Sequence, residues 1–481
     1  MKSASAKPPK LYSLIKLHKN GYPIRPVVSF FTAPSYIFSK KLIYIITENT
    51  NFLAKYSVKN STELINKIKN INLADNAKLI SFDVTNLFPS VPIIDTLVLL
   101  EKLLDSQNLN YIKKQEILES VKTCLNQNCF EFNNNFYSSN EGLIMGNPLS
   151  PLLAEIFMDH LENIICKHPL FKQFIYWHRY VDDILTCFTG TDRQLTQFLE
   201  FINTIHNNIK FTIEKEVDKS INFLDLTITR ENNTHNFSIF HKPSYTDTVI
   251  HSTSCHPIQH KFASFHSMLH RLLTVPLQTI NFNKELNIIK QIAVNNGYNP
   301  NIIDKLLKQK LYITATQMIF PTSIDRTNNY KTLTYVGQTS YKIGNFLKKL
   351  NVKIAFKTNN TLSKNIKNNK SKTNITDQSG VYQLTCANCP KTYIGQTGRI
   401  FSKRIKEHYS SFINKKSDSH YANHLLEENH DFNNQIKILH IENKGNRLNL
   451  LESLEINKLK HNNNLLNSQI DLNNSPLLNL F

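Results

Sequence analysis

The chain has 481 residues, 41% of them hydrophobic, which exceeds one typical domain and is enough to bury several cores. Its formal net charge of +19 favours a polyanionic partner, either nucleic acid or an anionic membrane surface. No apolar run approaches the ~18 residues of a membrane span, and the N-terminus lacks the apolar region of a signal peptide. The sequence therefore predicts a nucleic-acid partner and no membrane.

Seven cysteines, an odd number in a long chain, do not indicate a disulfide framework. We therefore expect a reducing intracellular compartment. Most of these cysteines are expected to act as small buried hydrophobic residues, and Cys386 and Cys389 are the exceptions.

Residues 9–29 contain two alternating apolar and polar runs separated by Asn20-Gly21. Asn-Gly between such runs is a strong signal for a β-hairpin. Lys16, Lys19 and Arg25 could then project from one small sheet toward an anionic ligand such as a nucleoside triphosphate. A solvated basic edge strand fits these residues equally well.

The next segments alternate helix and strand. A helical pattern over residues 32–70 leads to an apolar strand that carries Asp83 at its end. A lone carboxylate there is often only a helix cap. After a helical stretch and a hairpin at 129–137, a Gly- and Pro-rich turn leads into a helix expected at 152–166. This turn either approaches a ligand closely or is an ordinary loop in which Ser150 is the N-cap of the helix.

The segment 180–184, Tyr-Val-Asp-Asp-Ile, separates two strand-like runs and predicts a hairpin with two carboxylates at its tip. Adjacent aspartates repel each other unless a cation lies between them, and Mg²⁺ binds carboxylates together with substrate phosphates. An isolated Asp-Asp pair is more often a solvated turn. Paired across a sheet with Asp83, however, Asp182 would form one wall of a divalent-metal site.

In this order and spacing, the segments resemble a reverse transcriptase over residues 9–325. The blocks at 82–88, 222–226 and 254–257 are similar to those of the Penelope-like branch of retroelements. The resemblance implies an α+β multidomain fold, a right-hand polymerase with a ferredoxin-like palm. It places fingers and palm in residues 1–240 and a helical thumb in 241–325. The match begins close to the first residue, which indicates either a truncated chain or minimal fingers.

The resemblance also implies roles for single residues. It makes three acids the ligands of two Mg²⁺ or Mn²⁺ ions: Asp83, Asp182 and Asp183. It assigns nucleotide binding to five positions: Lys16, Arg25, Phe88, Gly146 and Asn147. Phe88 would exclude ribonucleotides sterically, which implies dNTP substrates, and a guanidinium at Arg25 matches phosphate geometry. Met145 stands where many reverse transcriptases have Gln, so backbone at the next two positions would contact the nucleotide.

Residues 326–378 are predicted to be a basic connector. Between Arg326 and Ile375 there are eleven Lys and Arg residues and no acid. The second half of this stretch is rich in Asn and Lys, which predicts a flexible linker. Its lysines would bind phosphates without sequence preference, or it is only a soluble spacer. A weak nuclear import signal at 364–372 and the retroelement resemblance predict nuclear localisation after cytoplasmic synthesis.

An ordered pattern resumes near Gly380, where two short strands carry Tyr382 and Tyr393. Together with residues that follow, these tyrosines resemble the GIY-YIG endonuclease family over residues 379–481, and this nuclease follows the reverse transcriptase in many Penelope-like elements. The resemblance implies a small α/β domain in which Tyr382 is the general base, assisted by Tyr393 and His408. By the same resemblance, Arg404 would clamp the scissile phosphate, Glu452 would bind Mg²⁺ and Asn467 would support the site. Arg399 is an alternative for the clamp, and Glu455 is an alternative for Glu452.

Cys386 and Cys389 form a Cys-x-x-Cys pair between the two tyrosine strands. With His424 and His430 they predict a Cys₂His₂ zinc site, and the spacing of the histidines is at the upper limit for such sites. His420 is an alternative ligand, and buried thiols without metal are an alternative interpretation.

These observations predict an RNA-directed DNA polymerase coupled to a DNA-nicking endonuclease, which retrotransposes by target-primed reverse transcription. Its partners would be an RNA template, a DNA primer or target, and dNTPs. The alternative is a catalytically decayed or domesticated nucleic-acid-binding protein derived from such an element.

Overall fold

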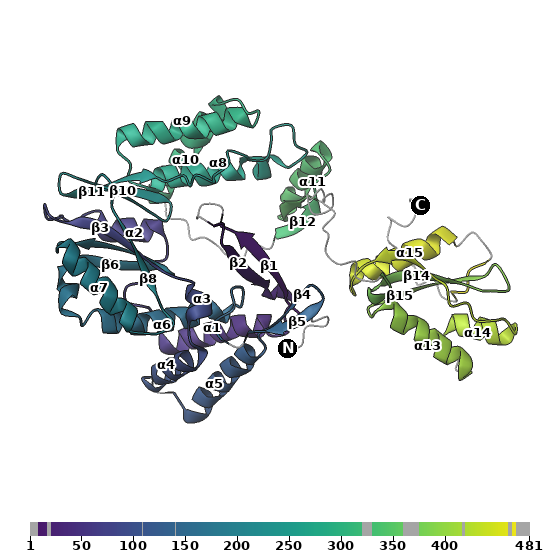
Figure 1. Ribbon diagram of the computed structural model, residues 1–481. Helices are drawn as coiled ribbons and strands as arrows, with labels where there is room; N and C mark the ends of the chain where they lie inside the picture. The colour runs from purple at the N-terminus through teal and green to yellow at the C-terminus, as the bar shows by residue number, and fades with distance from the viewer. Residues whose placement is uncertain are drawn as a thin grey trace. The chain divides into compact units, whose positions relative to one another are not determined.

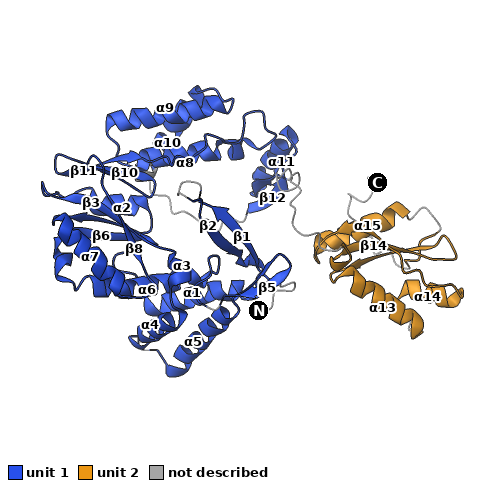
Figure 2. Ribbon diagram, viewed as in Figure 1, with its two compact units in different colours: residues 1–361 blue, residues 362–481 orange. Residues whose placement is uncertain are grey.

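The computed structural model describes residues 8–16, 21–107, 109–139, 141–319, 330–358, 375–415, 419–459 and 464–467. The chain divides into two compact units, residues 1–361 and residues 362–481 (Figure 2). Within the described ranges, no helix is long and apolar enough to cross a membrane.

A four-stranded antiparallel sheet organises the first unit (Figure 1). Its order is β6 (Phe174–Tyr180), β7 (Asp183–Phe188), β3 (Lys78–Val84) and β8 (Phe211–Lys215). Strand β3 is buried on both faces, which explains its nearly continuous apolar run. The sheet therefore needs a cover on each side.

Helices cover one face of this sheet through a large apolar core. Phe82 of β3 packs there against Trp177 and Phe198, with ring centroids 5.4 and 6.3 Å apart. The helices that contribute to this side are α1 (Tyr36–Thr50), α3 (Leu87–Ser90), α4 (Ile93–Asp105), α5 (Tyr111–Asn126), α6 (Leu149–Ile165) and α7 (Asp192–Thr204). A 3-10 turn, η2 (Pro169–Gln173), leads into β6.

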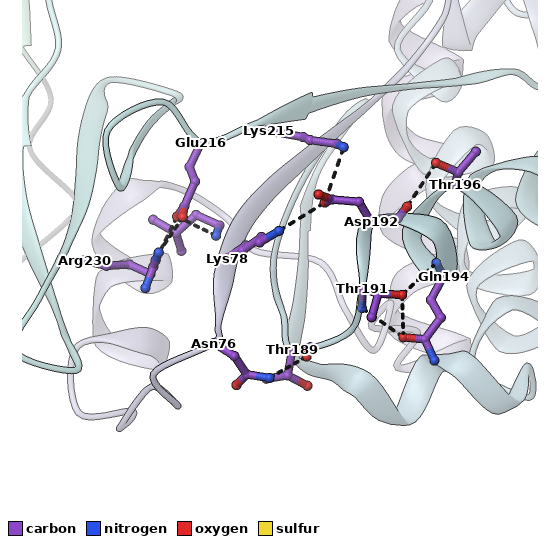
Figure 3. A network of polar contacts seen from close by, with 11 residues as sticks. Asn76, Lys78, Thr189, Thr191, Asp192, Gln194, Thr196, Lys215, Glu216 and Arg230 are labelled. Carbon is purple, nitrogen blue, oxygen red and sulfur yellow. Dashed lines mark hydrogen bonds and ion pairs between the residues drawn. The ribbon is translucent and has the colours of Figure 1, made fainter.

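The opposite face is covered by α2 (Ser61–Ile68) and a three-stranded antiparallel sheet of β9 (Ser220–Phe223), β10 (Leu226–Glu231) and β11 (Thr234–Ile239). Polar contacts join these layers at the sheet end remote from Asp83 (Figure 3). Glu216 accepts hydrogen bonds from the Leu79 backbone and from Arg230 Nε, both at 2.8 Å. Lys78 and Lys215 both pair with Asp192 at the start of α7.

A second four-stranded sheet lies in the N-terminal part of the first unit, in the order β2 (Ile24–Ser29), β1 (Lys10–Ile15), β4 (Cys129–Phe132) and β5 (Asn135–Ser138). The antiparallel β1–β2 and β4–β5 pairs confirm both predicted hairpins. A 3-10 turn, η1 (Phe30–Thr32), links β2 to α1.

The start of α6 differs from the prediction. The helix begins at Leu149, and Asn147 Oδ1 accepts the Leu149 N–H at 3.0 Å. Ser150 is already inside the helix and its Oγ donates to the Ile144 carbonyl at 2.8 Å. The predicted Ser150 cap is therefore wrong, because an Asx-type turn three residues earlier satisfies the free N–H groups.

Three helices form a separate core in the first unit: α8 (Ile258–Thr274), α9 (Thr279–Asn295) and α10 (Asn301–Ile319). The predicted helical region began at residue 241, but residues 241–257 form turns and loops. The three helices are followed by a small β-α-β unit of β12 (Tyr330–Thr334), α11 (Gln338–Lys349) and β13 (Lys353–Lys357). This unit lies within the predicted basic connector and was not predicted from the sequence. Most of the predicted flexible linker, residues 359–374, lies outside the described residues.

The second unit is built on an antiparallel sheet of β15 (Thr392–Thr397), β14 (Gly380–Thr385) and β16 (Ile436–Ile441), in that order. A 3-10 turn, η3 (Ile375–Asp377), precedes it, and three helices pack on it: α13 (Phe401–Ile413), α14 (His420–Glu427) and α15 (Asn446–Leu459). Its buried residues form two apolar clusters, one with Phe401 and Tyr421 and the other with Leu448 and Ile456.

Candidate active sites

The three predicted polymerase acids lie at one end of the central sheet. Asp83 of β3 is the register partner of Asp183 at the start of β7. The Val84 N–H donates to the Asp182 carbonyl at 2.9 Å, which fixes the hairpin tip beside β3. Val181 has a positive φ of 57°, a strained conformation for a β-branched residue, and this turn sets the position of Asp182. The structure thus brings Asp83, Asp182 and Asp183 together.

The electrostatics of this cluster suit a cation. Burial raises the pKa of Asp182, and the negative charge of Asp83 raises it further. The positive charges of Arg25 and Lys16 act in the opposite direction on the same pKa, so the β1–β2 hairpin brings both basic residues within electrostatic reach of the acids. Lys19 lies outside the described residues. Clustered carboxylates with basic side chains nearby form a site for a divalent cation and an anionic ligand.

A cleft of about 1000 Å³ adjoins the acids. Asp83 and Asp183 line it, together with the Leu224-Asp225 turn and Lys242. Asp225 also accepts a hydrogen bond from Ser61 of α2, and Arg271 of α8 lies 3.4 Å away. The cleft is as large as the upper range of ligand pockets, which is enough space for the end of a polymer.

The turn before α6 is docked on the N-terminal hairpin. Val28 donates its N–H to the Met145 carbonyl at 2.9 Å, and a Cβ on Gly146 would lie 2.0 Å from the Val28 carbonyl oxygen. Gly146 also has a φ of +113°, so both the lack of space and the backbone conformation require glycine at this position. The Asn147 side chain is buried, and its backbone N–H is used within the turn by the Ile144 carbonyl. Gly146 and Asn147 therefore couple the basic hairpin to α6.

Phe88 lies in α3, five residues after Asp83 of β3. Its ring packs, partly buried, against the core of the first unit, and its carbonyl accepts the Leu143 N–H at 2.7 Å. The loop with Phe88 and the turn at residues 141–148 are thus bonded to each other. This contact brings the two predicted nucleotide-binding loops into one surface region.

Arg179 supports the β6–β7 hairpin that carries the acids. The sequence did not identify it as a residue of the site. The side chain is 0% exposed, its Nε donates to Glu162 at 3.0 Å, and its two terminal nitrogens donate to Glu155 at 2.9 and 3.1 Å. One of these nitrogens also donates to the Val181 carbonyl at 3.3 Å, in the strained turn. Trp177 Nε1 donates to the same Glu162 oxygen at 3.1 Å. Arg179 therefore ties the turn that carries Asp182 to helix α6.

Residues 17–228, which contain all three acids, match the family described as reverse transcriptase (RNA-dependent DNA polymerase). This part of the chain is therefore similar to a reverse-transcriptase domain. Residues 248–308, which cover α8, α9 and the first part of α10, match the animal helix-turn-helix domain. No curated protein matches the chain in sequence.

Several solved polymerases are similar to the chain in structure. A telomerase from Candida albicans, in complex with a fragment of telomeric RNA, is 12% identical with a TM-score of 0.44, over 66% of this chain and 62% of that one. A telomerase from Candida tropicalis is 13% identical with a TM-score of 0.41, over 73% of this chain and 58% of that one. The RNA-dependent RNA polymerase of BmCPV is 12% identical with a TM-score of 0.38, over 60% of this chain and 26% of that one. The chain thus spans about six tenths of the telomerases' length, and the assignment of the reverse-transcriptase domain rests on the family match.

The second unit, outside the reverse-transcriptase domain, contains a buried Tyr-His-Arg cluster. Tyr382 of β14 and His408 of α13 are 0% and 1% exposed, and Tyr382 Oη lies 2.7 Å from His408 Nε2. Arg404, one helical turn before His408, donates its Nε to Tyr382 Oη at 3.2 Å. A Cβ on Gly395, the register partner of Tyr382, would lie 2.7 Å from that hydroxyl. The structure therefore joins three of the predicted nuclease residues and explains the glycine opposite them.

Burial sets the protonation of this cluster. It lowers the pKa of His408 to about 4, with the positive charge of Arg404 as a second cause, so this imidazole is neutral at pH 7. Burial also raises the pKa of Tyr382, and the nearby Tyr393 adds to the rise. The remaining His408 nitrogen, Nδ1, lies 2.7 Å from Ser419 Oγ. A neutral imidazole is thus placed between two hydroxyl groups.

Glu452 and Asn467 complete the predicted nuclease set. Burial raises the pKa of Glu452, while hydrogen bonds with Gln396 and the charge of Arg404 oppose the rise. Asn467 closes two hydrogen bonds on the backbone of Ile394, at 3.0 and 2.7 Å, and so fixes the strand between Tyr393 and Gly395.

The two alternative residues have other partners. Glu455 pairs with His440 and Lys458, each at 2.7 Å. Arg399, with a side chain 66% exposed, pairs with Glu407 at 2.6 Å, and Arg404 pairs with the same carboxylate at 2.9 Å. Among the described residues, Arg404 donates to the Tyr382 hydroxyl and Arg399 does not, so the geometry favours Arg404 over Arg399 and Glu452 over Glu455.

Cys386, Cys389, His424 and His430 lie together beside this cluster, with their ligand atoms within 4.8 Å of one another. Cys389 Sγ is 3.3 Å from His424 Nε2, and Cys386 Sγ is 3.4 Å from His430 Nδ1. A tetrahedral Zn²⁺ with Zn–S of about 2.3 Å and Zn–N of about 2.0–2.1 Å places neighbouring S and N atoms about 3.6 Å apart. The four donors therefore fit a zinc ion, and among the described residues His420 is not part of the group.

Proposed function

We propose that the protein is a Penelope-like retroelement enzyme, an RNA-directed DNA polymerase coupled to a GIY-YIG DNA endonuclease. It nicks target DNA and extends the exposed 3′-hydroxyl on an RNA template. The observation that supports this most is the meeting of Asp83 with Asp182 and Asp183 at one sheet end, inside a matched reverse-transcriptase domain. The Tyr382–His408–Arg404 cluster supports the second activity.

The proposed polymerase function also agrees with the strand order of the central sheet. The strands β3, β6, β7 and β8 follow one another along the chain, with helices after β3 and between β7 and β8. In the sheet they lie side by side in the order β6-β7-β3-β8. This strand order supports the proposal of a ferredoxin-like palm. The fingers and palm would occupy residues 1–240, the thumb 241–325, the connector 326–378 and the nuclease 379–481.

In the polymerase site, Asp83, Asp182 and Asp183 would hold two Mg²⁺ or Mn²⁺ ions, which when bound lower the pKa of the primer 3′-hydroxyl and stabilise the departing pyrophosphate. Lys16 and Arg25 bind the triphosphate, consistent with their electrostatic effect on Asp182. Phe88 excludes a 2′-hydroxyl, which selects dNTPs. The Met145 carbonyl and the close approach of Gly146 to Val28 fix the nucleotide loop to the strand that carries Arg25, and Asn147 closes the turn that leads into α6.

In the nuclease site, Tyr382 removes a proton from the attacking water. Because burial raises the pKa of this hydroxyl, it needs an acceptor for its own proton, and neutral His408 supplies Nε2 at 2.7 Å. Ser419 Oγ, which also accepts the Ala422 N–H, orients the ring through Nδ1. Arg404 clamps the scissile phosphate, Tyr393 assists, and Asn467 holds the strand. Glu452 would hold one Mg²⁺ or Mn²⁺, which stabilises charge on the phosphate when bound.

The remaining parts of the proposal follow from these two activities. Cys386, Cys389, His424 and His430 would hold a structural zinc ion, which when bound would stabilise the packing of α14 against the β14–β15 loop. The partners are an RNA template, a DNA primer or target, and dNTPs. The protein acts in the nucleus after synthesis in the cytoplasm.

Separation of the two activities tests the proposal. Asp182→Ala should abolish RNA-templated dNTP incorporation and spare DNA cleavage, and Arg404→Ala should do the reverse. Matched controls are Asp192→Ala, at the other end of the palm sheet, and Arg399→Ala, which loses only its bond to Glu407. Both controls should retain both activities. If Asp182→Ala or Arg404→Ala removed both activities in a folded protein, the two-site account would be wrong.

A further inference from the structure

The β12-α11-β13 unit is strongly basic, and within the described part of the chain one face of its strands is exposed. Residues 330–358 contain six lysines and no acid. The two strands are parallel, with Tyr330 paired to Lys353 and Thr334 paired to Lys357. Helix α11 packs on one side only, where Phe356 meets the Tyr341 ring at 5.1 Å and comes within reach of Gly344.

The alternation of side chains along a strand identifies the other side. Because Phe356 faces the helix, residues one position away on each strand point to the opposite face. This face, which we call the ribbon face, comprises Tyr330, Thr332, Thr334, Lys353, Ala355 and Lys357. All of them except Ala355 are exposed, and the Tyr330 side chain is 57% exposed.

The chemistry of the ribbon face matches a single nucleic-acid strand. An exposed aromatic ring offers a stacking platform for a base, and base stacking on such rings tolerates any sequence. Lysines bind phosphates, and threonine hydroxyls donate hydrogen bonds to phosphate or sugar oxygens. Four residues of strand span about 13 Å, so Lys353 and Lys357 are spaced to serve successive parts of one strand. The lack of any acid in residues 330–358 favours a polyanion over a neutral partner.

The β12-α11-β13 unit is joined through α11 to α8, a helix that also contacts a residue of the polymerase cleft. Tyr341 of α11 accepts the Ile258 N–H at 2.7 Å and donates to Gln259 Oε1 at 3.3 Å, so α11 is bonded to the first turn of α8 (Figure 1). Helix α8 also carries Arg271, which forms an ion pair with Asp225, and Asp225 lines the cleft together with Asp83. A strand that leaves the cleft along α8 therefore reaches the β12-α11-β13 unit.

We propose that the ribbon face is a binding site for single-stranded nucleic acid, in addition to the polymerase cleft. It binds through Tyr330 stacking and through Lys353 and Lys357. The inference concerns binding and does not require either catalytic activity. It deepens the proposed function by giving the single-stranded part of a template or primer a second contact.

Fluorescence anisotropy of the full chain with a labelled 15-nucleotide oligo(dT) tests this site. Lys353→Ala/Lys357→Ala should weaken binding and reduce the slope of log affinity against log salt by about 1.4, since each phosphate contact on a single strand contributes about 0.7. Tyr330→Ala should weaken binding about fivefold or more with an unchanged slope. The matched control is Lys348→Ala/Lys349→Ala, which removes the same charge from the last turn of α11. It should change affinity far less.

A position-specific readout distinguishes this site from the cleft. Photo-crosslinking of the same oligonucleotide carrying 5-iododeoxyuridine, followed by mass spectrometry, should label Tyr330. Equal losses in the control and in Lys353→Ala/Lys357→Ala, with no effect of Tyr330→Ala, would show diffuse charge attraction and overturn the proposal. Equal competition by poly-glutamate would show a surface for acidic peptides and also overturn it. A chain that binds at Tyr330 but lacks primer extension would leave this inference intact and refute only the proposed function.

Discussion

Replacing Arg179 with Met should destabilise the palm and impair the polymerase, for two separable reasons. The guanidinium is 0% exposed and neutralises Glu162, whose side chain is 1% exposed. It also donates to the Val181 carbonyl, in the turn that carries Asp182. The first contact concerns stability and the second concerns the position of a catalytic acid.

The magnitude follows from the burial of the pair. Removing one partner of a buried ion pair leaves an uncompensated charge and costs about 3–5 kcal/mol. A typical domain is stable by about 5–15 kcal/mol, so the single variant loses a large share. The double variant Arg179→Met/Glu162→Leu leaves no buried charge at this pair, and Glu155, with a side chain 26% exposed, remains solvated. We therefore expect the double variant to regain more than half of the lost stability.

Urea unfolding followed by tryptophan fluorescence measures this directly, because Trp177 is the chain's one tryptophan and donates to Glu162. Primer extension should stay impaired in the double variant, because the bond to Val181 is not restored. Arg230→Met is the control: it breaks a pair with Glu216 in a different part of the sheet and should leave primer extension unchanged. A double variant as unstable as Arg179→Met would refute the buried-charge argument. Full polymerase activity in Arg179→Met would refute the positioning argument.

The remaining predictions concern the second unit. Gly395→Ala should abolish cleavage and spare primer extension, because its Cβ would lie 2.7 Å from the Tyr382 hydroxyl, and a cleavage assay with normal rates would contradict this. The pKa of His408 is lowered to about 4 from an ordinary value near 6.5, so the unfolded state binds the extra proton and stability is lost as pH falls from about 6.5 to 4. His408→Gln should reduce the slope of that part of the unfolding profile of the full chain, and an unchanged slope would count against a buried neutral imidazole. Metal analysis of purified protein should find one zinc per chain, lost in Cys386→Ser and retained in Cys129→Ser, whose thiol is exposed and outside the metal group; zinc-free wild-type protein would contradict the site.

Local sequence rules predicted the elements that carry the sites. The Asn20-Gly21 hairpin, the strand ending near Asp83 and the hairpin around Asp182 all depend on alternation and turn residues, which act over a few positions. The predicted start of α6 is wrong because Asn147 and Ser150 can both cap the N-terminus of this helix. Only the tertiary contacts of the turn with Val28 decide between the two residues.

Contacts between distant segments could not be predicted in the same way. The register that places Asp83 opposite Asp183 depends on how the intervening residues 84–182 fold. Arg179 is a charged residue in a strand, and alternation with Trp177 was the only signal that it faces α6. The β12-α11-β13 unit was missed because its high charge obscured the short strands, which are stabilised by Phe356, Tyr335 and Tyr341.

The central claim is that the acids at the end of β3 and at the β6–β7 turn form a polymerase site. Its most direct test is primer extension by the full chain on an RNA template with Mg²⁺ and dNTPs, beside Asp182→Asn, which removes the charge and keeps the shape. The account predicts extension by the wild type, little or none by Asp182→Asn, and little with NTPs in place of dNTPs. Template binding without extension by the wild type would contradict it and favour a decayed or domesticated binding protein.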